Sequence, residues 1–401
     1  MEELYRQLAS NLNHVTGFIY PNEVELHWGL LVVIYPYVTG LVAGAFILAS
    51  LEKVFRVKEV EPTYRLAMLT ALAFLIVAPL PLLAHLGHPE RSFEIFLTPH
   101  LASAMATFGF VYAWYLMVVL LIEIWFEYRA DIVIWSRQAT GLRKWILRIL
   151  TLGSMDLSPQ SVRFDRKAVH AITIVGIPSA FLLHGYVGFI FGSVKANPWW
   201  SSVLMPIVFL FSAIVSGISL VLILYYVSTL LRGKEIDMTC MNKLASFLFY
   251  ALVLDLSLEL LDFIHRLYES EESISILREL IASKLFISLT IVQIILGTLG
   301  PLAILAIARF SNLPSELKRL GYLVAAGLVQ VGIFSTRWNV VIGGQLFSKS
   351  LRGLTVYKMQ LSGAEGLFSG LAFLIAPLVI LYILVKLLPP WTEARNRQVE
   401  P

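Results

Sequence analysis

Five ionisable residues fall on one face of a predicted helix in the second half of the chain. Asp255, Glu259, Asp262, His265 and Glu269 are separated by steps of 4, 3, 3 and 4 residues, and this spacing places their side chains on one helical face. Because the surrounding segment is apolar, ionisable groups there are costly unless they are paired or hydrated. The stripe therefore predicts either a buried charged network or a pathway through an apolar layer.

Three interpretations of this stripe stay open. In the first, Arg337, which lies among apolar residues of a later segment, forms a salt bridge with Glu259 or Asp262. In the second, Asp255, Glu259, Asp262 and His265 form a proton half-channel with Arg337 beside it. In the third, the same carboxylates bind an ion.

A second set of polar residues stands at the ends of other apolar segments. Its members are Glu25, His85, His88, Arg91, His184 and Tyr186. Side chains of these types donate hydrogen bonds or exchange protons with nearby water. A quinone headgroup needs a donor for each carbonyl and an acid or base for each proton, so this set is suited to binding one. The alternative is that His and Tyr simply favour the membrane–water interface.

The elements that must position these residues are membrane spans. The chain has 401 residues, of which 58% are hydrophobic and 14% charged, whereas soluble domains carry about 25% charged residues. Apolar runs of about 20 residues recur along the chain, which is typical of transmembrane helices. We expect an all-α polytopic membrane protein with nine spans. They lie at about 27–51, 65–87, 101–128, 167–193, 202–232, 240–268, 281–309, 318–345 and 364–389.

The distribution of basic residues predicts the orientation of these spans. Of the 31 Lys and Arg residues, 21 fall on one side of the nine spans and 10 on the other. The positive-inside rule then places the N-terminus outside and the C-terminus in the cytoplasm, in the cell membrane of a prokaryote. The long connection at 129–166 includes a basic amphipathic stretch, which is typical of a helix in the membrane interface.

Cysteine and histidine usage limits the cofactors. With Cys240 alone, the chain has no thiolate set for an iron–sulfur cluster and no attachment motif for c-type haem. His170 is the one histidine on the inner side, so we expect no His-ligated inner haem. One outer b-type haem on two of His27, His85 and His184 stays open. We expect no metal site. We also expect no nucleic-acid binding, because the basic residues sit in short loops between spans.

Several segments resemble motifs of the NrfD/PsrC family of integral membrane subunits. The turn at 81–91, the span end at 184–189 and the span entry at 197–206 resemble the corresponding parts of that family. The stretch Arg-Trp-Asn-Val-Val-Ile-Gly-Gly-Gln at 337–345 is the most specific. It is most similar to the DsrP (HmeB) branch, the quinone-interacting membrane subunits of the DsrMKJOP complex of sulfate reducers. The resemblance covers about residues 20–350.

The resemblance implies a fold of two four-helix bundles with one extra helix. We expect an extracytoplasmic segment at 1–26, a first bundle at 27–193, a second at 194–345, and a ninth helix with a cytoplasmic tail at 346–401. A departure concerns the turn, since His85 and His88 replace residues that are often Asp and Arg in the family. It leaves open which side chain holds a quinone and which relays a proton.

The resemblance also implies a function. Such a subunit has no haem or iron–sulfur cluster of its own and exchanges electrons between menaquinone near the outer face and a ferredoxin-like iron–sulfur subunit docked there. It works inside a respiratory complex linked to sulfite or sulfur-compound reduction, with proton translocation left open. Oxidoreductase activity would then belong to the complex rather than to this chain. The alternatives are a proton-coupled secondary transporter and a pure membrane anchor, with or without b-type haem.

Overall fold

The computed structural model describes residues 15–98, 100, 102–103, 114–269 and 273–391, and helices dominate it. The α-helices are α2 (Leu30–Lys53), α3 (Glu61–Val77), α4 (Leu80–His85), α5 (Glu94–Leu97), α7 (Leu121–Gln138), α8 (Gly141–Leu150), α9 (Pro159–Gly192), α10 (Met205–Leu231), α11 (Met238–Glu269), α12 (Ile274–Ser283), α13 (Gly300–Phe310), α14 (Ser315–Val341) and α15 (Leu367–Leu387). Two π-helices, η4 (Tyr115–Leu120) and η5 (Phe286–Leu299), lead into α7 and α13.

The predicted fold class, an all-α polytopic membrane protein, is confirmed. Within the described residues, eight helical segments are long and apolar enough to cross a membrane. They are Leu30–Lys53, Lys58–His85, Pro159–Gly192, Met205–Leu231, Met238–Tyr268, Phe286–Phe310, Ser315–Gln345 and Leu367–Leu387. The remaining predicted span, 101–128, lies partly outside the described residues, and its described part continues through η4 into α7.

Local sequence explains where several helices begin. Ser158 caps α9, because its hydroxyl accepts a hydrogen bond from the Ser161 amide at 3.3 Å. Pro159 occupies the first position of the same helix, where a missing N–H costs nothing. Pro206 likewise stands in the first turn of α10. The polar connections before α9 and α10 therefore end at residues that favour the start of a helix.

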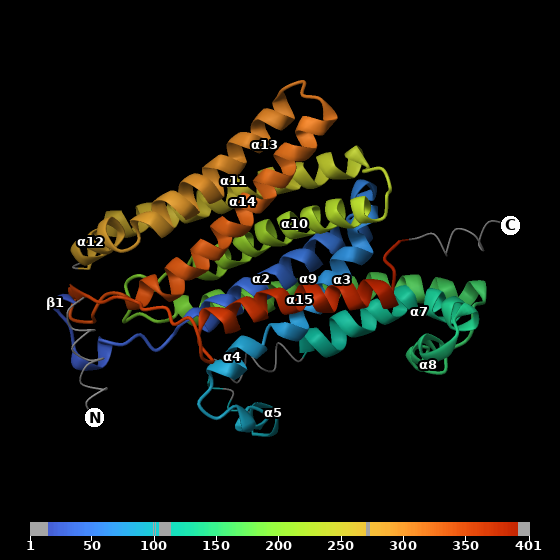
Figure 1. Ribbon diagram of the computed structural model, residues 1–401, viewed down its shortest axis with the longest axis horizontal. Helices are drawn as coiled ribbons and strands as arrows, with labels where there is room; N and C mark the ends of the chain where they lie inside the picture. Colours follow the sequence, from blue (N-terminus) through green and yellow to red (C-terminus); the bar gives the residue numbers. More distant parts are fainter. Residues whose placement is uncertain (1–14, 99, 101, 104–113, 270–272, 392–401) are drawn as a thin grey trace.

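The long helices pack in two groups that meet along α2 and α10 (Figure 1). In the first group α2 contacts α3 and α9, and α9 contacts α7 and η4. In the second group α10 contacts α11 and α14, and α14 contacts η5 and α13. Helix α15 returns to the first group and packs on α3 and α2. The described chain starts beside β1 at one end of the molecule and finishes after α15 at the other (Figure 1).

At the β1 end of the molecule, the segment before α2 contacts the segment after α14. Strand β1 (Thr16–Phe18) pairs antiparallel with β2 (Arg352–Leu354), with Gly17 opposite Gly353. The side chain of Gln345 accepts a hydrogen bond from the Trp28 amide at 3.0 Å and donates one to the Trp28 carbonyl at 3.1 Å. The segment before α2 is thereby fixed to the segment after α14.

Short 3₁₀-helices occupy several of the connections between the longer helices. They are η1 (Pro21–Glu23) before α2, η2 (Lys58–Val60) between α2 and α3, η3 (Pro89–Arg91) between α4 and α5, and η6 (Gly343–Gln345) after α14. Proline occupies the first position of η1 and η3, where its fixed φ angle suits a helical start. These connections are therefore short and locally ordered.

The two helix groups approach most closely where two glycines face each other. A methyl group on Gly44 of α2 would stand 2.0 Å from the Ala213 carbonyl oxygen and 2.8 Å from the Gly217 Cα of α10. A methyl group on Gly217 would stand 2.3 Å from the Gly44 carbonyl carbon. These neighbours are backbone atoms, so one helix must move to make room. Small residues at such crossings let backbones pack directly in the absence of a hydrophobic driving force.

We expect Gly217→Ala to destabilise the protein although alanine favours helices. The added methyl group forces α2 and α10 apart, and overpacking of this kind costs roughly 1–3 kcal/mol. Gly327→Ala in α14 is the matched control, because no atom lies within 4 Å of its methyl position. Thermal unfolding of the detergent-solubilised variants should show a lower midpoint for Gly217→Ala and an unchanged or higher one for Gly327→Ala. Equal midpoints would contradict the close crossing.

Candidate functional site

At the outer end predicted from the charge distribution, His85 meets an acid that no sequence pattern singled out. His85 is the last residue of α4, and its Nδ1 atom pairs with Oε1 of Glu365, just before α15. The His85 side chain is 22% exposed and the Glu365 side chain 37% exposed. A carboxylate in this position fixes the orientation of the imidazole ring. We call this pair, together with Tyr357, the outer site.

Tyr357 extends the outer site to the start of α2. Its hydroxyl accepts a hydrogen bond from the Leu30 amide at 3.1 Å. A methyl group on Gly29 would stand 2.8 Å from Oε2 of Glu365 and 3.2 Å from the Tyr357 hydroxyl oxygen, so glycine is what allows this approach. Burial, and then the charge of Glu365, raise the pKa of Tyr357. At neutral pH Tyr357 is therefore a phenol that retains its proton for donation.

The structure does not bring the other predicted headgroup residues to His85. His88 pairs with Glu90 at 3.0 Å on an exposed turn. Arg91 lies farther along that turn, 65% exposed, and its Nε atom is 2.9 Å from Oε1 of Glu94. Hydrogen bonding from Arg91 lowers the pKa of Glu94, as expected for this pair. The charges of the turn are thus compensated by their sequence neighbours.

The remaining predicted headgroup residues lie on other elements. Glu25 is exposed in the segment before α2. Tyr186 is half-buried in α9, where its ring stacks on Phe189 with centroids 6.1 Å apart. His184, two residues earlier, is fully buried. The four residues expected first at a headgroup are His85, His88, Arg91 and His184, with Glu25 and Tyr186 expected second, and the structure places them on several different elements.

His184 lies instead beside Arg337, between the two helix groups. Nη2 of Arg337 is 3.2 Å from Nε2 of His184 and donates to the Ser212 hydroxyl at 2.6 Å. The guanidinium carbon lies 4.1 Å from the centroid of the Phe209 ring, so a cation–π contact adds to these bonds. His184 and Arg337 are both completely buried. A histidine placed at an outer span end by sequence is here part of the protein interior.

The interpretation in which Arg337 forms a salt bridge with Glu259 or Asp262 is wrong, because both acids have other partners. Asp262 accepts from Nε of Arg266, one turn along α11, at 2.9 Å, and also bonds the Ser202 hydroxyl. Glu259 accepts from the amide of Gln293, at 3.3 Å to each carboxylate oxygen. Nε and Nη1 of Arg337 have no hydrogen-bond partner among the described residues, and Glu259 acts on the guanidinium only through its charge. Spacing defined the face of α11 correctly, but it does not show which neighbouring helix that face meets.

Asp255 and Glu259 are the members of the stripe that interact with Arg337 through their charge. Asp255 is 4% exposed, and the charge of Arg337 is the attraction that offsets its burial. Farther along α11, Glu259 and Asp262 are partly buried and His265 is exposed. The predicted stripe therefore runs from the protein interior to the surface along one helix.

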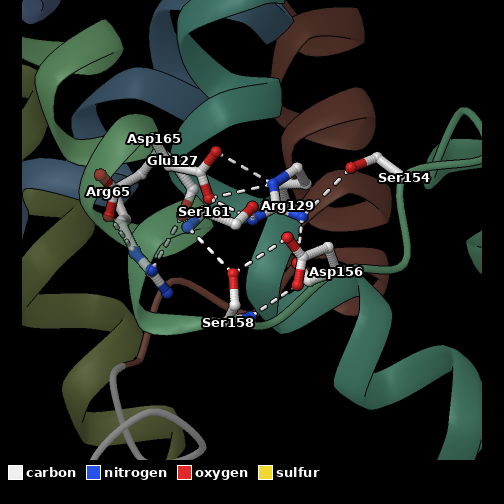
Figure 2. Close-up of polar contacts among 8 residues, drawn as sticks. All are labelled: Arg65, Glu127, Arg129, Ser154, Asp156, Ser158, Ser161 and Asp165. Carbon is white, nitrogen blue, oxygen red and sulfur yellow. Dashed lines mark hydrogen bonds and ion pairs between the residues drawn. The ribbon is translucent and has the colours of Figure 1, made fainter.

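A buried ionic network near α8, at the opposite end from β1, was not predicted from the sequence. Arg65 of α3 pairs with Glu127 at 2.9 Å and with Asp131 at 2.7 Å, both in α7. Figure 2 shows the neighbouring centre, where Arg129 pairs with Asp165 of α9 at 2.7 Å. The available signal was the spacing Glu127, Arg129, Asp131 at the predicted boundary between a span and a loop.

Arg129 also holds the connection between α8 and α9. It donates to the hydroxyls of Ser161 at 2.7 Å and Ser154 at 3.2 Å, and to the Asp156 carbonyl at 2.6 Å (Figure 2). Hydrogen bonds from Ser158 lower the pKa of Asp156 in the same connection. One guanidinium therefore joins α7, α9 and the loop, and these contacts stabilise the fold.

Comparison with known proteins identifies related membrane subunits. The family model described as "Polysulphide reductase, NrfD" matches residues 21–349. The chain is 35% identical over 325 residues to a selenate reductase subunit of Mesobacillus selenatarsenatis, covering 79% of this chain and 73% of that protein. It is 29% identical over 227 residues to a putative dimethyl sulfoxide reductase membrane subunit of Halobacterium salinarum, covering 54% of this chain and 48% of that protein.

We expect Arg337→Leu to destabilise the protein strongly. The change removes the hydrogen bond to Ser212 and the cation–π contact with Phe209, and it takes the positive charge away from the carboxyls of Asp255 and Glu259. Leaving buried polar partners unsatisfied costs about 1–3 kcal/mol for each group. Adding Asp255→Asn should restore part of this loss, because it removes the uncompensated charge. Thermal unfolding midpoints of the single and double variants measure both effects. Arg143→Leu, an exposed change in α8, is the control. A double variant no more stable than Arg337→Leu would refute the electrostatic coupling.

Proposed function

Because the chain belongs to the polysulphide reductase NrfD family of membrane subunits, we propose that it is the quinone-interacting subunit of a membrane redox complex. It exchanges electrons between a quinone bound near the outer membrane face and an iron–sulfur partner subunit docked there. The observation that supports this most is the outer site, in which His85, Glu365 and Tyr357 combine an imidazole, a carboxylate and a phenol at a helix start. These are the groups that quinone reduction and quinol oxidation need.

Each residue of the outer site has a distinct role in this proposal. The Tyr357 phenol donates a hydrogen bond to one quinone carbonyl. His85 donates to the other carbonyl and transfers the proton that accompanies the electrons. Glu365 orients the imidazole, and its 37% exposure gives the site access to outside water. Electrons pass to or from the partner subunit, because we propose no redox centre within this chain.

The names of the relatives support a reductase complex as the setting. One relative is named as a subunit of selenate reductase and another as a putative membrane subunit of dimethyl sulfoxide reductase. We propose a complex of the same general type, in the cell membrane, with the N-terminus outside. Menaquinone is the proposed quinone, and the DsrP-like stretch at 337–345 favours a sulfur compound as the substrate at the other end of the chain of carriers.

The outer site can be tested by titrating the purified chain with a fluorescent naphthoquinone analogue in its oxidised form. Wild type should quench the fluorescence saturably. Tyr357→Phe should weaken binding about fivefold, since one neutral hydrogen bond contributes about 1 kcal/mol. His85→Ala should weaken binding about tenfold or more, because both the donor and the partner of Glu365 are lost.

Arg91→Ala separates the outer site from the exposed turn. Its guanidinium is 65% exposed and already paired with Glu94, so this variant should bind the analogue as wild type does. Weaker binding of the analogue by Arg91→Ala but not by His85→Ala would indicate that the headgroup binds at the turn at 88–91 instead. No quenching by a folded chain would overturn a site formed by this chain alone.

A further inference from the structure

A groove opens on the second helix group, lined by elements that contribute nothing to the outer site. Its volume is about 340 Å³, and it lies between α11, η5 and α14. A hollow of about 820 Å³ shares Trp199, Phe263 and Thr290 with it. Volumes of roughly 300–1,000 Å³ are typical of small-molecule sites. We call this the α11–α14 groove.

The outer walls of the α11–α14 groove are apolar and lie at the surface of the helix group. Leu260 and Phe263 are 50% and 45% exposed, and Trp199 adds a second aromatic ring to the lining. In a membrane, such a surface is open to the hydrocarbon layer. Aromatic walls pack well against a flat ring. The groove is therefore accessible to a lipophilic molecule that carries a ring.

On the inner side of the groove, a relay of hydrogen bonds runs from Ser288 to Glu259, with each residue donating to the next. Ser288 donates to Oδ1 of Asn339 at 2.6 Å, and Nδ2 of Asn339 donates to Oε1 of Gln293 at 2.8 Å. Gln293 in turn donates to Glu259, at 3.3 Å to each oxygen. Asn339 and Gln293 are 2% and 7% exposed. The relay therefore ends on carboxylate oxygens, which accept.

We propose that the α11–α14 groove binds the hydroquinone form of a lipid-soluble quinone. A ring hydroxyl donates to Glu259, the ring lies against Trp199 and Phe263, and the apolar tail follows the exposed surface of α11. The oxidised quinone has only carbonyl acceptors, so it meets Glu259 acceptor to acceptor and binds less well. This second site does not depend on the outer site.

The charges around the groove disfavour a phospholipid headgroup. Glu259 and Asp262 both line it, and they repel a phosphate. Arg266 lines the groove as well, but its guanidinium is already engaged by Asp262 at 2.9 Å and by the Pro198 carbonyl. A neutral headgroup that donates hydrogen bonds fits this surface better than an anion that accepts them.

A photoreactive naphthohydroquinone tests the proposal with the full chain in lipid nanodiscs. After illumination under anaerobic conditions, mass spectrometry should locate labels in peptides covering 256–266 and 286–294. The oxidised probe should label these peptides at least tenfold less. Glu259→Gln should abolish this preference, because an amide supplies a donor as well as an acceptor. Thr290→Trp should block labelling by filling the groove while leaving the relay unchanged.

A matched variant separates the groove from the outer site. Glu365→Gln should retain labelling of the groove peptides, and Glu259→Gln should retain any label at the outer site, so failure of one site is distinguished from failure of the other. Equal labelling by both redox forms in wild type would overturn the proposal. So would labelling that Glu259→Gln leaves unchanged.

Discussion

The buried guanidinium of Arg337 is the constraint on which the arrangement of the two helix groups depends. It extends from α14 and bonds His184 of α9 and Ser212 of α10, while Asp255 and Glu259 of α11 interact with it through their charge. A charge inside an apolar bundle is tolerated only with such compensation. The two helix groups also meet directly at Gly44 of α2 and Gly217 of α10, where an added methyl group would clash with the backbone of the facing helix.

The sequence predicted the helices well because a membrane makes one demand on all of them. Each span must be about 20 apolar residues long, so hydropathy alone located eight segments that the structure confirms. The stripe from Asp255 to His265 was likewise predictable, because it depends only on the 3.6-residue period of one helix. The properties of a single helix depend on the local residue pattern, which can be recognised without knowledge of the fold.

The partners of the site residues could not be predicted in the same way. His85 pairs with Glu365, which lies 280 residues away along the chain, and no periodicity links the two. Asp262 pairs with Arg266 on its own helix rather than with Arg337. Such pairings depend on how helices are rotated and stacked, and one chain's spacing does not contain that information.

The outer site and the α11–α14 groove differ in the direction of their hydrogen bonds. The outer site ends in groups that donate, the Tyr357 phenol and the His85 imidazole. The groove ends in the Glu259 carboxylate, an acceptor to which the Gln293 amide already donates. A molecule that changes from acceptor to donor on reduction would therefore favour a different site in each redox state. Under the two proposals together, the chain separates the two forms of one lipophile by hydrogen-bond polarity.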